Sequence, residues 1–93
     1  MNKAEARQLL TEKLGEYRKL SFVQLVAKID REDHFEILGA SGTAYQIEVQ
    51  CFWDDKPGGD LRVMATIDDG GLLSFVPLCQ DFILSPEGRF VGE

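Results

Sequence analysis

The sequence predicts an α+β fold in which two N-terminal helices pack on one face of a four-stranded antiparallel meander. Apolar residues recur every three or four positions up to about residue 30, which is helical spacing, and every second position after residue 33, which is strand spacing. Gly, Asp and Pro separate the alternating segments at hairpin-sized intervals. A chain of 93 residues of ordinary composition then forms one domain, with a helical part (1–30), an antiparallel sheet (33–76) and a C-terminal turn or hairpin (77–93).

Two capping boxes mark the predicted helices. Asn2 with Glu5 begins the first, and its apolar stripe comprises Ala6, Leu9, Leu10, Leu14 and Tyr17. Ser21 with Gln24 begins a second and shorter helix over about residues 22–30. Both stripes are expected to cover the same face of the sheet, because each helix otherwise leaves an apolar side in water.

The predicted strands follow from alternation, and their register follows from opposing inward residues to inward residues. The register pairs Ile37 with Tyr45, Phe35 with Ile47, Trp53 with Leu61 and Cys51 with Val63. Leu73 and Phe75 supply a fourth strand before Pro77. Two turns remain open for the third hairpin: an odd loop through Asp68-Asp69-Gly70 turns Leu73 and Phe75 inward, whereas a two-residue Asp69-Gly70 turn places Leu72 and Val76 inward instead.

The C-terminal segment contains a turn signal. Ser85-Pro86-Glu87-Gly88 fits a type I turn, with Pro at its second and Gly at its last position. Residues 82–84 and 89–91 are therefore expected to form a small terminal hairpin. Gly39 to Thr43 superficially resembles a phosphate loop, but it lacks the lysine and leads from strand to strand, so it is predicted to be a plain hairpin loop.

Charge is distributed unevenly along the chain. Residues 1–31 contain seven Lys or Arg against four Asp or Glu, whereas residues 32–93 contain three against twelve. An acidic body argues against nucleic-acid binding and favours a cationic partner. The chain has neither a membrane-length apolar stretch nor an apolar leader at its N-terminus, so no membrane association and a cytoplasmic location are expected. Cys51 and Cys79 are interpreted as small buried hydrophobes rather than a disulfide or a zinc site.

Five aspartates gather in two turns that a meander places at opposite ends of the sheet, roughly 20 Å apart. They cannot share one ion, and Asp with Gly is also what turns require. The remaining metal hypothesis is a weak divalent-cation site at one end of the sheet, formed by Asp54, Asp55, Asp60 and Asp81. No cofactor is expected.

His34 is the single histidine of the chain. The register places it opposite Glu48 and beside Glu36 on the face away from the core, where a solvated histidine with acidic neighbours is expected. The same face is the candidate partner interface or homodimer surface, and Phe52 lies across from Arg62 in a candidate cation–π pair. The predicted interface residues are Leu38, Phe52, Arg62, Met64, Leu72 and Val76.

Several blocks of the sequence resemble those of a family of small bacterial proteins of unknown function. They are SGTAYQIEVQCFWDDKPGG, RVMATIDDGG, SFVPL and the ending FVGE, within residues 41–93. The resemblance implies no activity, cofactor or partner.

The sequence therefore favours a small cytoplasmic, non-catalytic module for protein binding or assembly, acting through the outer sheet face or the acidic hairpin ends. One alternative is a metal-dependent hydrolase built on the four aspartates named above. Another is an acidic immunity-type inhibitor of a basic toxin.

Overall fold

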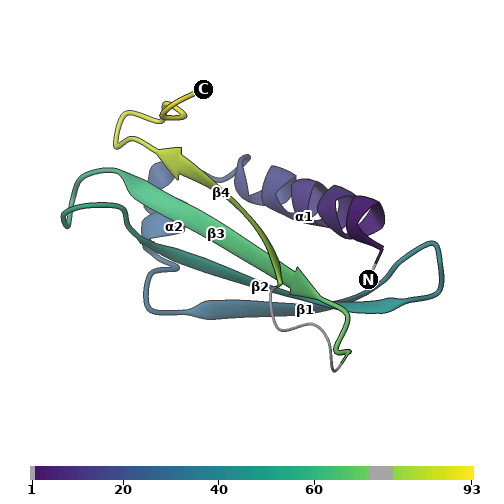
Figure 1. Ribbon diagram of the computed structural model, residues 1–93. Helices are drawn as coiled ribbons and strands as arrows, with labels where there is room; N and C mark the ends of the chain where they lie inside the picture. Colours follow the sequence, from purple (N-terminus) through teal and green to yellow (C-terminus); the bar gives the residue numbers. More distant parts are fainter. Residues whose placement is uncertain (1, 72–76) are drawn as a thin grey trace.

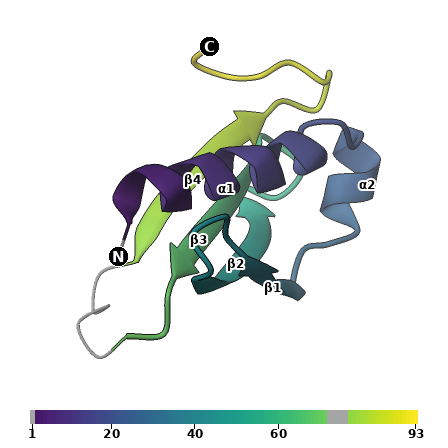
Figure 2. The same cartoon turned by 90° about the vertical axis from the view of Figure 1, so that its right-hand side faces the viewer.

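The computed structural model describes residues 2–71 and 77–93. It contains α1 (Lys3–Tyr17), α2 (Phe22–Val26), β1 (Glu32–Leu38), β2 (Ala44–Trp53), β3 (Leu61–Asp68) and β4 (Leu78–Leu84). The strands form one antiparallel sheet in the order β1-β2-β3-β4, and α1 runs along one face of it (Figures 1 and 2). The α+β class and the meander are confirmed, with one long and one short helix.

Helix α1 begins at the predicted cap and buries the predicted stripe. The side chain of Asn2 accepts a hydrogen bond from the backbone N–H of Glu5 at 3.1 Å. The Glu5 carboxylate does not complete the capping box, because it reaches instead to Ser41 and Tyr45 on the β1–β2 hairpin. The buried helix residues are Ala6, Leu10, Leu14 and Tyr17. They pack mainly over β3 and β4.

Helix α2 has its full capping box but is shorter than the predicted 22–30. Gln24 N–H donates to Ser21 Oγ at 3.1 Å, and Ser21 N–H donates to the Gln24 side chain at 2.8 Å. The helix ends at Val26 because the chain is already turning into the sheet: Ile29 forms an isolated parallel bridge with Cys51, and Asp30 adopts the left-handed φ of 68°.

The predicted register of the first two hairpins is confirmed. Ile37 faces Tyr45 and Phe35 faces Ile47, and across the second hairpin Trp53 faces Leu61 and Cys51 faces Val63. The inward positions of β2 and β3 are buried: Tyr45, Ile47, Val49, Cys51, Leu61, Val63, Ala65 and Ile67. The demand that these groups share one interior was sufficient to set the pairing.

The C-terminal segment is a correction. Residues 78–84, which were expected to belong to a turn or terminal hairpin, form strand β4. The predictions for Leu72, Leu73, Phe75 and Val76 lie outside the described residues. In β4, Phe82 faces Val63 and Leu84 faces Leu61, and both β4 side chains are buried. Residues 82–84 thus belong to the main sheet, and the expected terminal hairpin is reduced to the predicted turn and one bridge between Leu84 and Phe90.

The C-terminal tail returns to the end of α1. The Arg18 guanidinium lies 4.7 Å from the ring centroid of Phe82 and 4.9 Å from that of Phe90. It also donates two hydrogen bonds of 2.9 Å to the Glu93 carboxylate. Cation–π and bidentate ion-pair contacts therefore join the first helix to the last residues of the chain. Neither described helix has the length and apolar character needed to cross a bilayer.

Candidate functional site

The face of the sheet turned away from α1, here called the outer face, is the main candidate surface. Alternation along each strand places on it Glu32, His34, Glu36, Leu38, Gln46, Glu48, Gln50, Phe52, Arg62, Met64, Thr66, Cys79, Asp81 and Ile83. Leu38 is 73% exposed, and Phe52, Met64 and Ile83 are partly exposed. Ile83 is a member that sequence reasoning missed, because it had been assigned to the terminal hairpin.

Arg62 is the centre of one polar cluster on the outer face, the arginine cluster of Asp54, Arg62 and Asp81. Arg62 faces Phe52 across β2 and β3 as predicted, but its guanidinium turns to the two carboxylates. It donates to Asp54 Oδ1 through Nε at 2.8 Å and through a terminal nitrogen at 2.7 Å, and it also donates to Asp81. The bonds to Asp54 and then to Asp81 raise the pKa of Arg62.

Three of the four aspartates of the metal hypothesis, Asp54, Asp55 and Asp60, lie at one end of the sheet, whereas Asp81 lies in the middle of β4 and pairs with Met64. Asp54 and Asp81 meet on the guanidinium of Arg62, which supplies the positive charge that a metal ion otherwise provides. Asp55 and Asp60 lie in the β2–β3 connection, which is closed by a 2.9 Å hydrogen bond from Asp54 N–H to the Asp60 carbonyl. Within residues 2–71 and 77–93, these four do not form a group of three with converging ligand atoms.

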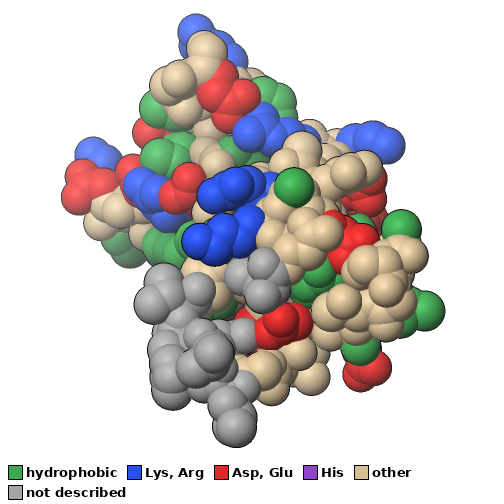
Figure 3. Space-filling model, turned by 45° about the vertical axis from the view of Figure 1, so that its right-hand side comes forward, with side chains coloured by type: hydrophobic (Ala, Val, Ile, Leu, Met, Phe, Trp, Pro, Cys, Tyr) green, Lys and Arg blue, Asp and Glu red, His purple; other side chains and the backbone are tan. Residues whose placement is uncertain are grey.

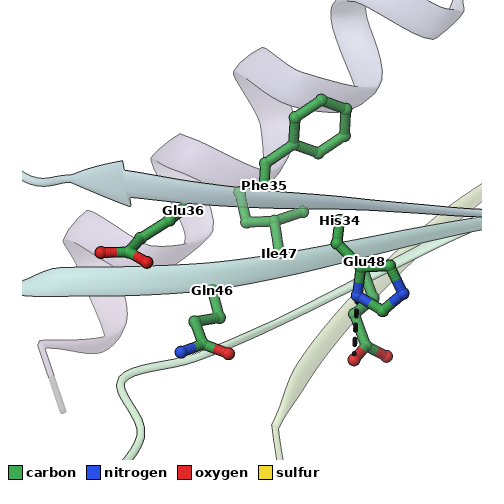
Figure 4. Close-up of a pocket in the computed structure, with 6 residues that line it drawn as sticks. All are labelled: His34, Phe35, Glu36, Gln46, Ile47 and Glu48. Atoms are coloured by element: carbon green, nitrogen blue, oxygen red, sulfur yellow. Dashed lines mark ion pairs between the residues drawn. The ribbon is translucent and has the colours of Figure 1, made fainter.

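A second polar cluster, the histidine cluster, consists of Glu32, His34 and Glu48. His34 Nδ1 lies 3.5 Å from Glu48 Oε1, and His34 Nε2 lies 3.9 Å from Glu32 Oε2. The side chains are between 42% and 60% exposed. Figure 4 shows His34 and Glu48 projecting from adjacent strands toward each other, whereas Phe35 projects from the opposite side of the sheet. Gln50 donates a 2.9 Å hydrogen bond to Glu32 Oε1.

The sequence predicted part of this second cluster. The pairing of His34 with Glu48 on the outer face is confirmed by the register. Glu32 was missed because the predicted sheet began at residue 33, although Glu32 stands two positions before His34 and so shares its face.

Glu5 forms a third polar contact, on the inner side of the molecule. Its carboxylate accepts hydrogen bonds from Tyr45 Oη at 2.8 Å, Ser41 Oγ at 2.6 Å and Ser41 N–H at 3.0 Å. These bonds lower the pKa of Glu5, and the bond from the Ser41 side chain has a larger effect than the bond from Tyr45. A Cβ at Gly39 would lie 2.7 Å from the Glu5 carboxylate, so this loop is shaped around a carboxylate of the same chain.

The two cysteines are free thiols on opposite faces of the sheet. Cys51 is buried as predicted, but the prediction is wrong for Cys79, which is exposed because β4 turns it to the outer face. Burial raises the pKa of Cys51 to about 11, and burial also raises the pKa of Cys79. Because the thiolate is the reactive form, neither environment activates a nucleophile.

Both signs of charge lie interspersed with hydrophobic side chains on the side of the molecule shown in Figure 3.

Comparisons with protein-family models, with curated proteins and with solved structures found no match to this chain. The interpretation of the candidate surface therefore depends on its chemistry.

Proposed function

We propose that the protein is a non-catalytic binding module that docks a basic protein surface on its outer sheet face. The observation that carries the proposal is that α1 covers the other face (Figure 2), while the strand register and exposure place Leu38, Phe52, Met64 and Ile83 on the outer face. An open face of an antiparallel sheet is ordinarily polar, so apolar side chains on it favour an interaction surface.

The acidic side chains around these apolar groups define the chemistry of the partner. Glu36 and Asp81 lie on the outer face together with the two glutamates of the histidine cluster. Arg62, the outer-face arginine, is already engaged by Asp54 and Asp81. A basic partner is therefore attracted, whereas a second copy would bring like charges together.

Three further observations support a non-catalytic, intracellular role. The pKa of each thiol is raised, which disfavours thiolate chemistry. His34 and Cys79 belong to opposite edge strands, three strand spacings or about 14 Å apart, so they do not form a dyad. Two free thiols also fit a reducing compartment, and we assign the protein to the cytoplasm on that basis.

The alternatives differ in their support. An inhibitor of a basic toxin is a narrower form of the same proposal, because it would use the same acidic face. The hydrolase built on Asp54, Asp55, Asp60 and Asp81 is less well supported, because Arg62 already occupies the space between two of the four carboxylates.

Site-specific photocrosslinking in the native host tests the proposal. Benzoylphenylalanine replaces Met64 on the outer face, and the matched control carries it at Gln8, which is exposed on α1. We expect position 64, but not position 8, to crosslink a protein of net positive charge. The product is expected to diminish at about 1 M NaCl, where charges are screened beyond about 3 Å.

Two outcomes would contradict the proposal. Identical crosslinked products from both positions would show that the outer face is not the docking surface. A product with twice the 10.4 kDa mass of the chain would identify the partner as a second copy. Light scattering of the wild type and of Phe52→Glu gives an independent measure of self-association.

A further inference from the structure

We infer that Glu32, His34 and Glu48 form a binding site for a divalent transition-metal ion, with zinc as the best chemical fit. One nitrogen of His34 and one carboxylate oxygen from each glutamate lie within 4.8 Å of one another. Among the described residues, no other group of three potential metal ligands converges in this way. The inference goes beyond the proposed docking function and does not depend on it.

The sheet places the three side chains on a regular scaffold. Glu32 and His34 are two positions apart on β1, so both project from the same face, and Glu48 lies directly opposite His34 on β2. Ligands on paired strands are held more accurately than ligands on loops. The histidine is therefore flanked along its own strand by one carboxylate and across the sheet by another.

The donor atoms match the chemistry of zinc. Zinc binds imidazole nitrogen and carboxylate oxygen at about 2 Å, so two ligands of one ion lie at most about 4 Å apart. The 3.5 Å from His34 Nδ1 to Glu48 Oε1 falls within this limit, whereas the 3.9 Å contact to Glu32 is made by the other ring nitrogen, Nε2. With one nitrogen and one oxygen from each glutamate, the three ligand atoms lie within 4.8 Å of one another, and all three side chains are exposed enough to rotate into the closer spacing that one ion requires. Calcium and magnesium prefer more oxygen ligands and no nitrogen.

The surroundings favour an added cation. Gln50 holds one oxygen of Glu32 and leaves the other toward His34, the arrangement in which a neighbouring hydrogen bond orients a metal ligand. A shallow hollow of about 270 Å³ is lined by His34 and Glu48 together with Glu36 and Gln46 (Figure 4). Glu32 does not line this hollow, so it gives room for water on the Glu48 side of the imidazole.

The arginine cluster on the same face provides the internal comparison. There, two carboxylates share the permanent charge of Arg62. In the histidine cluster, the group between the two carboxylates is an imidazole, which carries no permanent charge and whose nitrogens are common metal ligands. The charges of Asp54 and Asp81 are thus balanced by an arginine of the same chain. The charges of Glu32 and Glu48 leave a place for an external cation.

NMR of the imidazole is the sharpest test, because the chain has one histidine and its ring signals need no assignment by mutation. The full-length, untagged chain carries Cys79→Ser, since an exposed thiol would itself bind zinc. Zinc chloride is titrated at about pH 7.5, and calorimetry measures the stoichiometry. We expect the ring signals to shift and saturate at one equivalent, with no shift on adding magnesium.

Variants connect the signal to the site. His34→Gln is expected to abolish binding and Glu48→Gln to weaken it about tenfold or more. The matched control Glu87→Gln, an exposed acid in the turn after β4, is expected to leave the affinity unchanged. Circular dichroism verifies that each variant is folded.

The inference is overturned if the ring signals do not shift at about 1 mM zinc, or if His34→Gln binds zinc as the parent does. It is also overturned if Glu48→Gln and Glu87→Gln weaken binding equally, because binding would then reflect net charge alone. Photocrosslinking from position 64 is unaffected by any of these results, so the two proposals fail separately.

Discussion

The two faces of the sheet use the same strands for different purposes. On β3, the inward residues Leu61, Val63, Ala65 and Ile67 are 0% exposed, while the residues between them are partly exposed. The inner face is closed by α1 and carries the hydrophobic stabilisation, whereas the outer face holds polar clusters at little cost to folding. The difference teaches that stability and recognition can be changed separately in this domain. Substitutions at inward positions of a strand are expected to change stability, and substitutions at the outward positions between them are expected to change recognition.

Truncating a leucine on each side gives the largest contrast. Leu10 is 0% exposed under the sheet, and Leu38 is 73% exposed on the outer face. We expect Leu10→Ala to lower the free energy of unfolding by about 2–5 kcal/mol. Leu38→Ala is expected to change it by less than about 0.5 kcal/mol. Urea unfolding measures both, and equal losses would mean that the outer face is packed like the inner one.

Tyr17→Phe is expected to have the next largest effect. The Tyr17 hydroxyl donates to the Asp33 carboxylate, which also accepts from Lys28 at 3.2 Å. The hydrogen bond from Tyr17 is the main cause that lowers the pKa of Asp33. Burial acts in the opposite direction, and the bond from Lys28 lowers the pKa further. Removing a hydrogen bond to a part-buried charged group is expected to cost about 1.5 kcal/mol at pH 7.

The pH dependence of that loss follows from the direction of the pKa shift. The pKa of Asp33 is lower in the folded state, so its stabilisation is complete above the ordinary value of 3.8 and disappears as the pH falls through the folded-state pKa. The difference between wild type and Tyr17→Phe is therefore expected to narrow in acid. A difference that stays constant between pH 7 and about pH 2 would contradict this role of Asp33.

Glu5→Gln is expected to have a smaller effect at the rim of the inner face. The variant loses the charge that accepts the Ser41 and Tyr45 hydrogen bonds, so its melting temperature at pH 7 falls below that of the wild type. The pKa of Glu5 is lowered by folding from its ordinary value of 4.5, so the difference is present above that pH and is lost on acidification. Glu12→Gln, on the exposed side of α1, is the matched control and is expected to melt as the wild type does.

His34→Arg is expected to have the smallest effect on stability and a decisive effect on the comparison between the two outer-face clusters. It places a permanent cation between Glu32 and Glu48, as Arg62 does between its two aspartates. Exposed ion pairs contribute little, so we expect a slight rise in the melting temperature and complete loss of zinc binding. Scanning calorimetry and the zinc titration measure the two effects, and a marked fall in melting temperature would show that His34 has a structural role.

The sequence was sufficient to predict strand pairing where the burial of inward side chains allowed a single register. The pairings of Ile37 with Tyr45 and of Cys51 with Val63 followed from placing all inward groups in one interior. The position of His34 opposite Glu48 followed from the same register. These inferences required only alternation and short turns.

The fourth strand required information that alternation does not contain. Residues 73 and 75 alternate as convincingly as Phe82 and Leu84, and nothing local to either segment sets the length of the connection. Strand β4 is distinguished by distant partners, including Arg18 at the C-cap of α1, which lies against Phe82. The arginine cluster was missed for the same reason, because Asp81 reaches Arg62 only in the β4 register.

The meander also has a consequence for the order in which the domain assembles during synthesis. Each strand pairs with its neighbour in the chain, so the hairpins of β1 to β3 can form as they leave the ribosome. Helix α1 is synthesised before the strands, yet it packs on both β3 and β4, and Arg18 reaches to Glu93. A nascent chain halted before residue 78 therefore leaves the leucine-rich face of α1 only partly covered, and the uncovered part is available to chaperones.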